Sequence, residues 1–541
     1  MLSSMLTRAR AGQPLWLPDV RAAFLNTGDY DLVVRLYLWD GGAREWRHRL
    51  ARWDGAAERE LVRSYLCACV FNALSVCGGR EAVFYFDTGE TALAALVGEL
   101  DGLFRSCAGL GRVRNIAARM GRAFGAEGTA LRFSSADISS YEPLPGAPAR
   151  STPDLAKTLR GLCAEAETRN LIGIDIGGTD IKLAASAKGR LVAVREYDWN
   201  PAAFSTADEL LGPVLALLRE ARERLGAAPD GVGVSFPDIV LRDRIVGGET
   251  PKTDGIRRNG SLDYESEFAK IGALKEAVLS LCAPGGRCRV TNDGNAAAFT
   301  AAMEMACGTA EDGAAVQNGV LAHTLGTDLG TGWLASSGTI PSMPLELYDL
   351  LIDLGSFPAA ALPPADLRSV RNENSGLAGA RRYLGQAAAW RLAYALDPDM
   401  VRDFVALRRG VPVIRTEPED LRKSCLAHLM ALAGAGRGEA EEVFRQIGRH
   451  LAQLSREAEF LLSPETPVRY LFGRFVRSKR CFELLREGFK ETVRHIILER
   501  ADEALANTPL MRQLADMPNV TPAQFGQAVG AIYFSLTEEQ K

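Results

Sequence analysis

The chain has 541 residues, of which 47% are apolar and 24% are charged, and its formal net charge is −4. This balance is typical of a globular protein with a large core, and the length predicts about three compact units. The apolar fraction excludes a chain that is too polar to form a hydrophobic core. The longest apolar run, 65–76, is interrupted by Asn72 and is too short to span a bilayer, so no membrane association is expected.

The amino terminus and the cysteines indicate a cytoplasmic chain. The first residues are apolar, but Arg8, Arg10 and Asp19 interrupt them, so we expect no signal peptide. Ten cysteines without regular spacing indicate reduced and mostly buried thiols, and Cys67 and Cys69 fall within a helical pattern that predicts core positions. The five histidines are scattered and have no metal-ligand spacing.

Residues 1–140 are expected to form an α+β domain of unknown role. The apolar pattern predicts strands at 31–40 and 82–87 and helices at 58–77 and 91–107. Residues 1–150 contain 18 Arg, no Lys and 16 Asp plus Glu, a net charge of only +2, so nucleic acid is not an expected partner. A small basic cluster is expected to be a solvated helix face; it consists of Arg112, Arg114, Arg119 and Arg122.

Residues 141–170 are expected to connect this domain to the rest of the chain. The stretch 141–153 is rich in proline, which is typical of a linker at a domain boundary. A helix from about 154 to 168 is then expected to lead into a buried strand.

Residues 171–182 read Leu-Ile-Gly-Ile-Asp-Ile-Gly-Gly-Thr-Asp-Ile-Lys and predict a strand that ends in a tight turn. Ile181, Leu183 and Ala185 then alternate as in a returning strand, which fits neither a Walker loop nor a dinucleotide fingerprint. Glycine lets backbone N–H groups approach a phosphate, so the turn is a candidate phosphate loop, although Gly-Gly also makes ordinary hairpins. Lys182 could reach a phosphate or be a solvated hairpin lysine, and the sequence favours neither.

Four later segments have related features. Residues 231–238 predict a buried strand stopped by proline, and 325–333 supply a second glycine–threonine turn between strands. Residues 289–298 run from a strand through Asn292 and Asp293 into an alanine-rich helix, which puts a carboxylate where open α/β sheets bind ligands. Residues 468–473 form a strand that ends in glycine, before a helical pattern at 481–489.

Read in this order, residues from about 171 to the end resemble the ROK family (repressor, open reading frame, kinase) of sugar kinases and sugar-sensing regulators. The stretch 171–182 is similar to the phosphate-1 motif of the family, and 325–333 is similar to phosphate-2. The run Thr-Asn-Asp-Gly-Asn-Ala-Ala from 291 to 297 is similar to the signature E-N-D-A-N-A-A. The adenosine motif matches only in part, since its usual Gly-Gly reads Gly473-Arg474.

The resemblance implies an α/β fold with two actin-like ATPase lobes of the ribonuclease H-like class, preceded by the extra α+β domain. The first lobe would cover 171–290 and the second 291–515, and 516–541 would form a helix that returns to the first lobe. Dimers are usual in the family, so a homodimer stays open, although nothing in the sequence demonstrates an interface.

The resemblance also implies ATP-dependent phosphorylation of a hydroxyl on a hexose or hexose derivative, with Asp293 as general base. ATP, Mg²⁺ and the sugar are the expected small-molecule partners. Asn292 and Glu346 would contact the sugar, together with Asp349, which falls where many family members have histidine. The residues expected to bind the nucleotide are Asp175 (through water on Mg²⁺), Gly177, Gly178, Thr179, Lys182, Gly326, Thr327, Gly330, Thr331, Gly332 and Gly473.

Two departures concern the sugar side of the site. No cysteine occurs between Cys307 and Cys425, so the C-x-C-G-x-x-G-C zinc cluster of many family members is missing and no structural zinc is expected. The stretch Lys252-Thr253-Asp254 stands where the family often has a sugar-binding asparagine. The identity of the sugar therefore does not carry over, and a charged acceptor such as an amino sugar or a sugar acid stays open.

A second function also stays open. With Arg474 in the adenosine motif and an unexplained amino-terminal extension, the alternative is a catalytically inactive sugar or nucleotide sensor that acts through the amino-terminal domain. In that case Asp293 would serve as a helix N-cap, a role that Asp and Asn often have before alanine-rich sequence.

Overall fold

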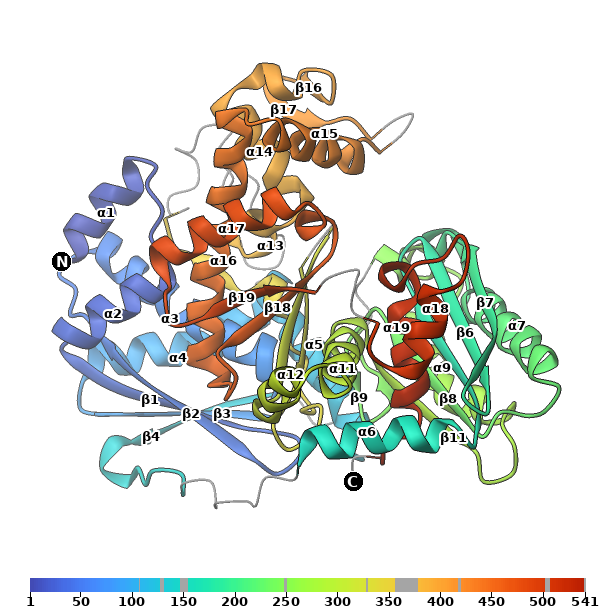
Figure 1. The fold of residues 1–541 in the computed structure, drawn as a ribbon. Helices are drawn as coiled ribbons and strands as arrows, with labels where there is room; N and C mark the ends of the chain where they lie inside the picture. The colour runs from blue at the N-terminus through green and yellow to red at the C-terminus, as the bar shows by residue number, and fades with distance from the viewer. Residues whose placement is uncertain are drawn as a thin grey trace.

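A computed structural model gives the fold of the chain (Figure 1). It describes residues 1–106, 108–126, 131–145, 154–247, 251–326, 329–355, 378–416, 420–501 and 506–539. Three units follow one another: an amino-terminal α+β unit, a first lobe around a five-stranded sheet and a second lobe around a four-stranded sheet.

The amino-terminal unit contains a sheet in the order β2-β1-β3-β4, in which β4 runs parallel to β3 and the other pairs are antiparallel. Its strands are β1 (Tyr30–Tyr37), β2 (Ala43–Leu50), β3 (Glu81–Phe86) and β4 (Arg132–Asp137). Its helices are α1 (Leu2–Arg10), α2 (Leu17–Thr27), α3 (Ala56–Cys77), α4 (Thr91–Ser106) and α5 (Ala108–Ala123). The elements predicted near 31–40, 58–77, 82–87 and 91–107 are all present, whereas α1, α2, β2, β4 and α5 were not predicted.

Helix α3 is the central helix of this unit. It is long and apolar enough to cross a membrane, but 89% of its most apolar window is buried inside the protein. Cys67 and Cys69 lie in that core, as predicted. Asn72 is fully buried and is satisfied by Leu351, whose N–H donates to its Oδ1 at 2.8 Å and whose carbonyl accepts from its Nδ2 at 3.1 Å. The helix therefore belongs to a packed protein interior.

The first lobe has the strand order β11-β8-β5-β6-β7. Strands β5, β6 and β7 are antiparallel neighbours, whereas β8 and β11 run parallel to β5. The strands are β5 (Asn170–Ile176), β6 (Asp180–Ala187), β7 (Arg190–Asp198), β8 (Gly231–Phe236) and β11 (Arg287–Asn292). Three antiparallel strands followed by two parallel ones is the topology of the ribonuclease H-like fold.

Helices cover both faces of this sheet (Figure 1). One face packs against α7 (Ala207–Leu225), α9 (Tyr264–Gly272) and α10 (Leu274–Leu279). The other face packs against α19 (Pro522–Phe534), drawn in red among the green strands. The approach of α19 is close because two strand residues are glycine: a Cβ at Gly173 would lie 1.9 Å from the carbonyl oxygen of Ala528, and one at Gly233 would lie 1.8 Å from that of Ala531.

The second lobe repeats most of this topology in a sheet ordered β13-β12-β18-β19. Strands β12 and β13 are antiparallel, and β18 and β19 run parallel to β12. The strands are β12 (Val320–Leu325), β13 (Leu329–Leu334), β18 (Val468–Phe472) and β19 (Ile497–Arg500). One face carries α11 (Asp293–Ala306), and the other packs against α16 (Gly438–Leu462) and α17 (Lys479–Thr492). The expected two-lobed actin-like fold with an added α+β unit is confirmed.

Smaller elements complete the two lobes. In the first lobe they are β9 (Val240–Leu241), β10 (Arg244–Ile245) and α8 (Asp254–Arg258). In and around the second lobe they are α6 (Leu155–Ala166), α12 (Ala310–Ala315), β14 (Leu351–Asp353), β15 (Ala378–Gly379), α13 (Arg381–Leu384), α14 (Gln386–Leu396), β16 (Val405–Arg408), β17 (Val411–Ile414) and α15 (Arg422–Gly434). Helix α18 (Pro509–Ala515) lies beside α19 in the first lobe, where Gln513 accepts from the Leu191 N–H of β7 (Figure 1).

The amino-terminal unit shares one hydrophobic core with the second lobe. The buried Arg21 and Glu457 side chains form an ion pair at 2.7 Å, and Asp353 of β14 accepts from the Leu15 N–H at 2.7 Å. In Figure 1 the blue helices accordingly lie against the orange helix α16. The domain boundaries predicted at 140, 170, 290 and 515 stay predictions. At the first of them, the hydrophobic core continues from the amino-terminal unit into the second lobe.

Helix α5 of the amino-terminal unit also contacts the first lobe. Arg119 is buried, and its Nη2 lies 2.6 Å from Oε1 of Glu265 on α9. Ile116 and Met120 pack against Ile239 and neighbouring residues of the first lobe. The prediction of a solvated helix face is therefore wrong for Arg119, because that face of the helix meets another unit.

Candidate functional site

The first glycine turn connects β5 and β6 as predicted. The Gly177 N–H donates to the Asp180 carbonyl at 2.8 Å, which closes the turn. Trp199 holds it from one side, since its indole N–H donates to the Gly177 carbonyl at 3.0 Å and its backbone N–H donates to the Thr179 carbonyl at 3.1 Å. Gly178 and Thr179 are exposed. The turn therefore has a fixed backbone and an open side that an anion can approach.

Asp175, at the end of β5, is bonded across the sheet. It is the register partner of Ser235 on the parallel strand β8, and the Ser235 hydroxyl donates to its Oδ1 at 2.6 Å. Burial, reinforced by the negative charge of Asp293, raises the pKa of Asp175 to about 6, against the opposing effects of the Ser235 bond and of Lys182. Sequence reasoning missed Ser235, although parallel pairing of two buried strands would have put it beside Asp175.

Lys182 is paired within the hairpin. Its ammonium group contacts the Asp180 carboxylate, and it lies 3.7 Å from a carboxylate oxygen of Glu196 on β7. Only 15% of its side chain is exposed. The sequence left two roles open for Lys182, a phosphate ligand or a solvated hairpin lysine. The structure favours neither role, because two carboxylates balance the charge of the side chain and most of it is buried.

Asn292 and Asp293 lie where β11 ends and α11 begins. Asn292 is the N-cap: its Oδ1 accepts from the Gly294 N–H at 2.8 Å and from the Asn295 N–H at 3.4 Å, and its Nδ2 donates to the Asp238 carbonyl at 2.9 Å. Asp293 is the first helical residue and accepts from the Gly294 N–H at 2.8 Å. The capping role thus belongs to Asn292, whose polar atoms already have protein partners.

Burial raises the pKa of Asp293, whereas the positive charge of Lys252 and the Gly294 N–H act in the opposite direction. Asp293 and Asp175 are close enough for the charge of one to affect the other. The structure therefore brings the proposed base to the strand end beside the first glycine turn.

The second glycine turn lies between β12 and β13, and Thr327 falls outside the described residues. Gly326 and Gly330 are half-buried at its two ends. Gly332 faces the start of α11, since a Cβ there would lie 1.8 Å from the Gly294 carbonyl oxygen. Thr331 is buried, and its hydroxyl lies 3.0 Å from Nδ1 of His323. The strand that follows this turn is thus packed directly onto the helix that carries Asp293.

Gly473 joins the end of β18 to the same region. It has a φ of +96°, and a Cβ there would lie 2.2 Å from the Leu325 carbonyl oxygen. A side chain at this position would meet both a left-handed backbone and the end of β12, so glycine is required. The sequence-predicted adenosine segment and the second turn are therefore neighbours.

Glu346 and Asp349 lie at a short 3₁₀ turn, Leu347–Asp349, that is held by α3. The Leu345 N–H donates to the Val76 carbonyl at 3.0 Å and the Glu346 N–H to the Ser75 carbonyl at 3.1 Å. Asp349 is buried, with an oxygen 3.9 Å from Nε of Arg381. Both acidic residues line a cavity whose other walls come partly from α3 and α5: Phe71, Leu74, Ser75, Val113, Ile116 and Pro344. Sequence reasoning did not connect these helices with the site.

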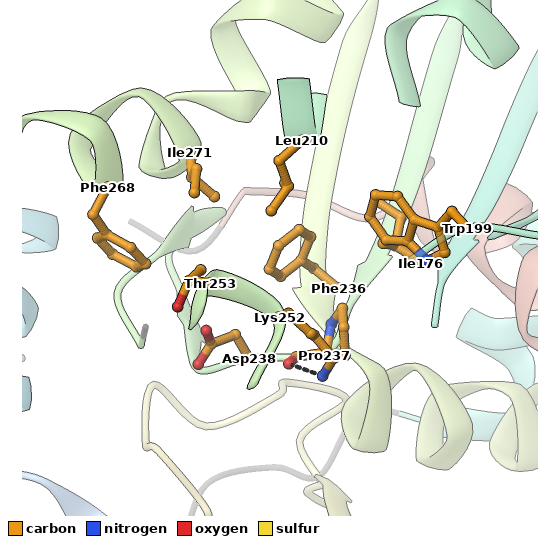
Figure 2. A pocket seen from close by; sticks show the side chains of 10 residues that line it. All are labelled: Ile176, Trp199, Leu210, Phe236, Pro237, Asp238, Lys252, Thr253, Phe268 and Ile271. Atoms are coloured by element: carbon orange, nitrogen blue, oxygen red, sulfur yellow. Dashed lines mark hydrogen bonds between the residues drawn. The ribbon is translucent and has the colours of Figure 1, made fainter. Parts of the chain in front are cut away.

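A second cavity opens at the carboxyl end of β8 (Figure 2). Its polar lining consists of Asp238, Lys252 and Thr253, and the Lys252 ammonium donates to the Pro237 carbonyl at 2.8 Å. The apolar lining includes Phe236 from β8 and Trp199, which braces the first turn. Among the described residues no group of three or more His, Cys, Asp or Glu side chains is arranged to hold a metal ion.

Comparisons with known proteins give likeness in structure only. The chain matches no protein-family model, and no curated protein sequence matches it. A ROK hexokinase from Thermus thermophilus is 18% identical, with a TM-score of 0.41 over 68% of this chain and 97% of that one. A ROK-family glucokinase from Streptomyces griseus, in complex with glucose and AMPPNP, is 18% identical, with a TM-score of 0.40 over 68% and 99%.

A ROK-family transcriptional regulator, a homologue of the E. coli MLC protein, is 12% identical, with a TM-score of 0.42 over 68% of this chain and 79% of that one. The fold assigned above rests on the strand order of the two sheets.

Proposed function

We propose that the chain is an ATP-dependent kinase of the ROK type that phosphorylates a hydroxyl group of a hexose or hexose derivative. The observation that carries the proposal is the position of Asp293. It follows β11 beside Asp175 and the first glycine turn, and the next residue, Gly294, packs onto the strand that leaves the second turn. One carboxylate thus lies between two candidate phosphate turns.

Phosphoryl transfer requires positioning and charge neutralisation more than covalent work by the protein. The exposed backbone of Gly178 and Thr179 would donate to phosphate oxygens, and Gly326 and Gly330 would flank the nucleotide on the opposite side. Mg²⁺ bound with ATP would neutralise charge on the phosphates. Asp175 fits a water-mediated contact with that ion, because carboxylate oxygens are preferred magnesium ligands and its pKa of about 6 leaves it ionised at neutral pH.

Asp293 would accept the proton of the attacking hydroxyl as that oxygen bonds to the γ-phosphorus. Its surroundings suit this role: burial raises the pKa of the carboxyl, which makes it a better base, and the positive charge of Lys252 limits the rise. On the acceptor side, Glu346 and Asp349 would meet sugar hydroxyls. Asn292 would hold the Asp293 turn in place and offer at most its second Nδ2 hydrogen to the sugar.

The test is Mg²⁺-ATP turnover against a panel of hexoses, N-acylhexosamines and sugar acids, with Asp293→Asn as the control. Asparagine keeps the shape and the bond from the Gly294 N–H but cannot accept a proton. We expect turnover on one class of sugar and a loss on the order of 10²- to 10⁴-fold in the variant, with AMPPNP binding retained. Equal turnover by Asp293→Asn and the wild type would reject Asp293 as the base.

The sensor alternative has one structural observation in its favour. Asp349, where many family members have histidine, is 2% exposed and lies near Arg381. A carboxylate already engaged by the protein contributes less to sugar binding. Absence of turnover on every sugar, with a sugar or AMPPNP still binding by calorimetry, would favour the sensor.

A further inference from the structure

Lys252 lies between the first glycine turn and the proposed base. A Cβ built on Gly178 would lie 3.7 Å from its Cε, which is ordinary contact distance. Its charge acts on Asp293, and its ammonium donates to the Pro237 carbonyl at 2.8 Å (Figure 2). Three parts of the candidate site, each from a different strand end, therefore surround one lysine side chain.

The charge of Lys252 is not balanced by any carboxylate within 4 Å in the part of the chain that the structure describes. An ammonium group has three donors, and the bond to Pro237 uses one of them. Lys182 offers a contrast on the neighbouring hairpin, because its charge is matched by Asp180 and Glu196. Of these two lysines, Lys252 is the one with donors left for an anion.

We infer that Lys252 is a further catalytic residue, whose ammonium group contacts the phosphoryl group during its transfer from ATP to the acceptor. The inference rests on the proposed kinase function. The space between a phosphate turn and the base is where the γ-phosphorus meets the attacking hydroxyl. Negative charge spreads over three phosphoryl oxygens in the transition state, and a fixed lysine donor stabilises it there.

The step is balanced without any further reactant. A bond forms between the acceptor oxygen and the γ-phosphorus, and the bond from that phosphorus to the oxygen bridging the β- and γ-phosphates breaks, which releases ADP. The hydroxyl proton passes to the Asp293 carboxylate. Lys252 keeps its three protons and supplies only charge and hydrogen bonds.

Two other roles for Lys252 predict different results. It could merely anchor its own segment to the turn after β8 through the Pro237 carbonyl, or it could bind an anionic group on the acceptor. Lys252→Gln removes the charge but keeps a donor that can reach toward Pro237. Lys252→Arg keeps the charge. Lys157→Gln is a matched control, because Lys157 is an exposed residue on α6, which contacts the carboxyl end of α11 at Ala306 and not the end that begins at Asp293.

The experiment measures kcat and KM for ATP and for the acceptor, together with calorimetric binding of AMPPNP and of ADP in the presence of Mg²⁺. For Lys252→Gln we expect kcat to fall on the order of 10²-fold, with weaker AMPPNP binding and unchanged ADP binding. Lys252→Arg should retain more activity than Lys252→Gln, and Lys157→Gln should match the wild type. The acid limb of the kcat/KM profile of Lys252→Gln should also move to higher pH, because Asp293 loses a neighbouring positive charge.

Each contrary result has a separate meaning. Wild-type kcat and AMPPNP binding in Lys252→Gln overturn the inference and leave the kinase proposal intact. Equal losses of AMPPNP and ADP binding with a lower Tm indicate an anchoring role, and a loss confined to KM for an anionic acceptor indicates acceptor binding; both overturn it. A wild-type protein that binds neither nucleotide rejects the proposed function itself, and the inference falls with it.

Discussion

Asp175 and Asp293 are two carboxylates that affect each other within one partly dehydrated site. Different neighbours oppose the rise in the two pKa values. The Ser235 hydroxyl does so for Asp175, and Lys252 and the Gly294 N–H do so for Asp293. These neighbours come from β8, from the segment Pro251–Thr253 and from the start of α11. With a pKa of about 6, Asp175 is ionised at neutral pH despite its burial, at a cost in stability.

That cost gives a pH-dependent prediction for Asp175→Asn. The pKa of Asp175 is raised in the folded protein to about 6, so the unfolded chain loses this proton at lower pH than the folded chain does. Stability should therefore fall as pH rises from about 4 to about 6, and the variant should avoid that fall. At pH 7.5 we expect Asp175→Asn to unfold at a higher Tm than the wild type without ligand, by a margin equivalent to at most about 2 to 3 kcal/mol.

The same comparison at pH 4 serves as the control, since both proteins then carry a neutral side chain that can accept from Ser235. An equal difference in Tm at the two pH values would show that the effect does not come from the charge of Asp175.

At the scale of elements, two glycines determine how α19 fits the first sheet. Gly233→Ala would put a Cβ 1.8 Å from the Ala531 carbonyl oxygen, so either β8 or α19 must move. We expect a loss of about 1 to 3 kcal/mol in the free energy of unfolding, as for other overpacked cores. Urea denaturation of the purified protein measures it.

Gly212→Ala is the matched control for that substitution. Gly212 lies on α7 and has no atom within 4 Å of the position of an added Cβ. Alanine there should stabilise the helix by about 0.5 to 1 kcal/mol. A loss of similar size in both variants would mean that the close packing of α19 is not the cause.

The sequence predicts these elements unevenly, for physical reasons. The hairpin β5–β6, the strand ends at 236 and 292 and the turn between β12 and β13 are predictable, because short apolar runs and glycines act locally. Whether Asn292 or Asp293 caps α11 could not be read from the sequence, since both residue types favour the position. Ser235 was not assigned a role because only the pairing of β8 with β5 brings it to Asp175. No contact of Lys252 with the base was predicted, because its segment, Pro251–Thr253, comes near Asp293 only through the fold.

At the scale of the whole molecule, the amino-terminal unit is the part that the sequence describes least. Its core is continuous with that of the second lobe, and α5 reaches the first lobe through Arg119 and Glu265. Such long-range packing has no local sequence pattern. The unit also supplies the carbonyl groups of Ser75 and Val76 that hold the turn at Glu346, a residue proposed to meet the sugar.

This packing predicts that the amino-terminal unit cannot be removed. Residues 154–541 expressed alone should aggregate, because an apolar face that includes the surroundings of Glu457 would be exposed. The full chain, cut at a protease site engineered into the connector 141–153, should keep its two fragments together in size-exclusion chromatography. Separation of the fragments, with a soluble 154–541 piece, would contradict the shared core and favour an independent sensory module.

The position of α19 has a consequence for how the chain reaches its folded state. This helix ends at Phe534, yet it covers the face of β5 and β8, which begin at Asn170 and Gly231. A ribosome that makes the protein must therefore synthesise the entire second lobe before the first sheet can be closed. Until then the nascent first lobe presents an uncovered apolar surface, which exposes it to association with other chains.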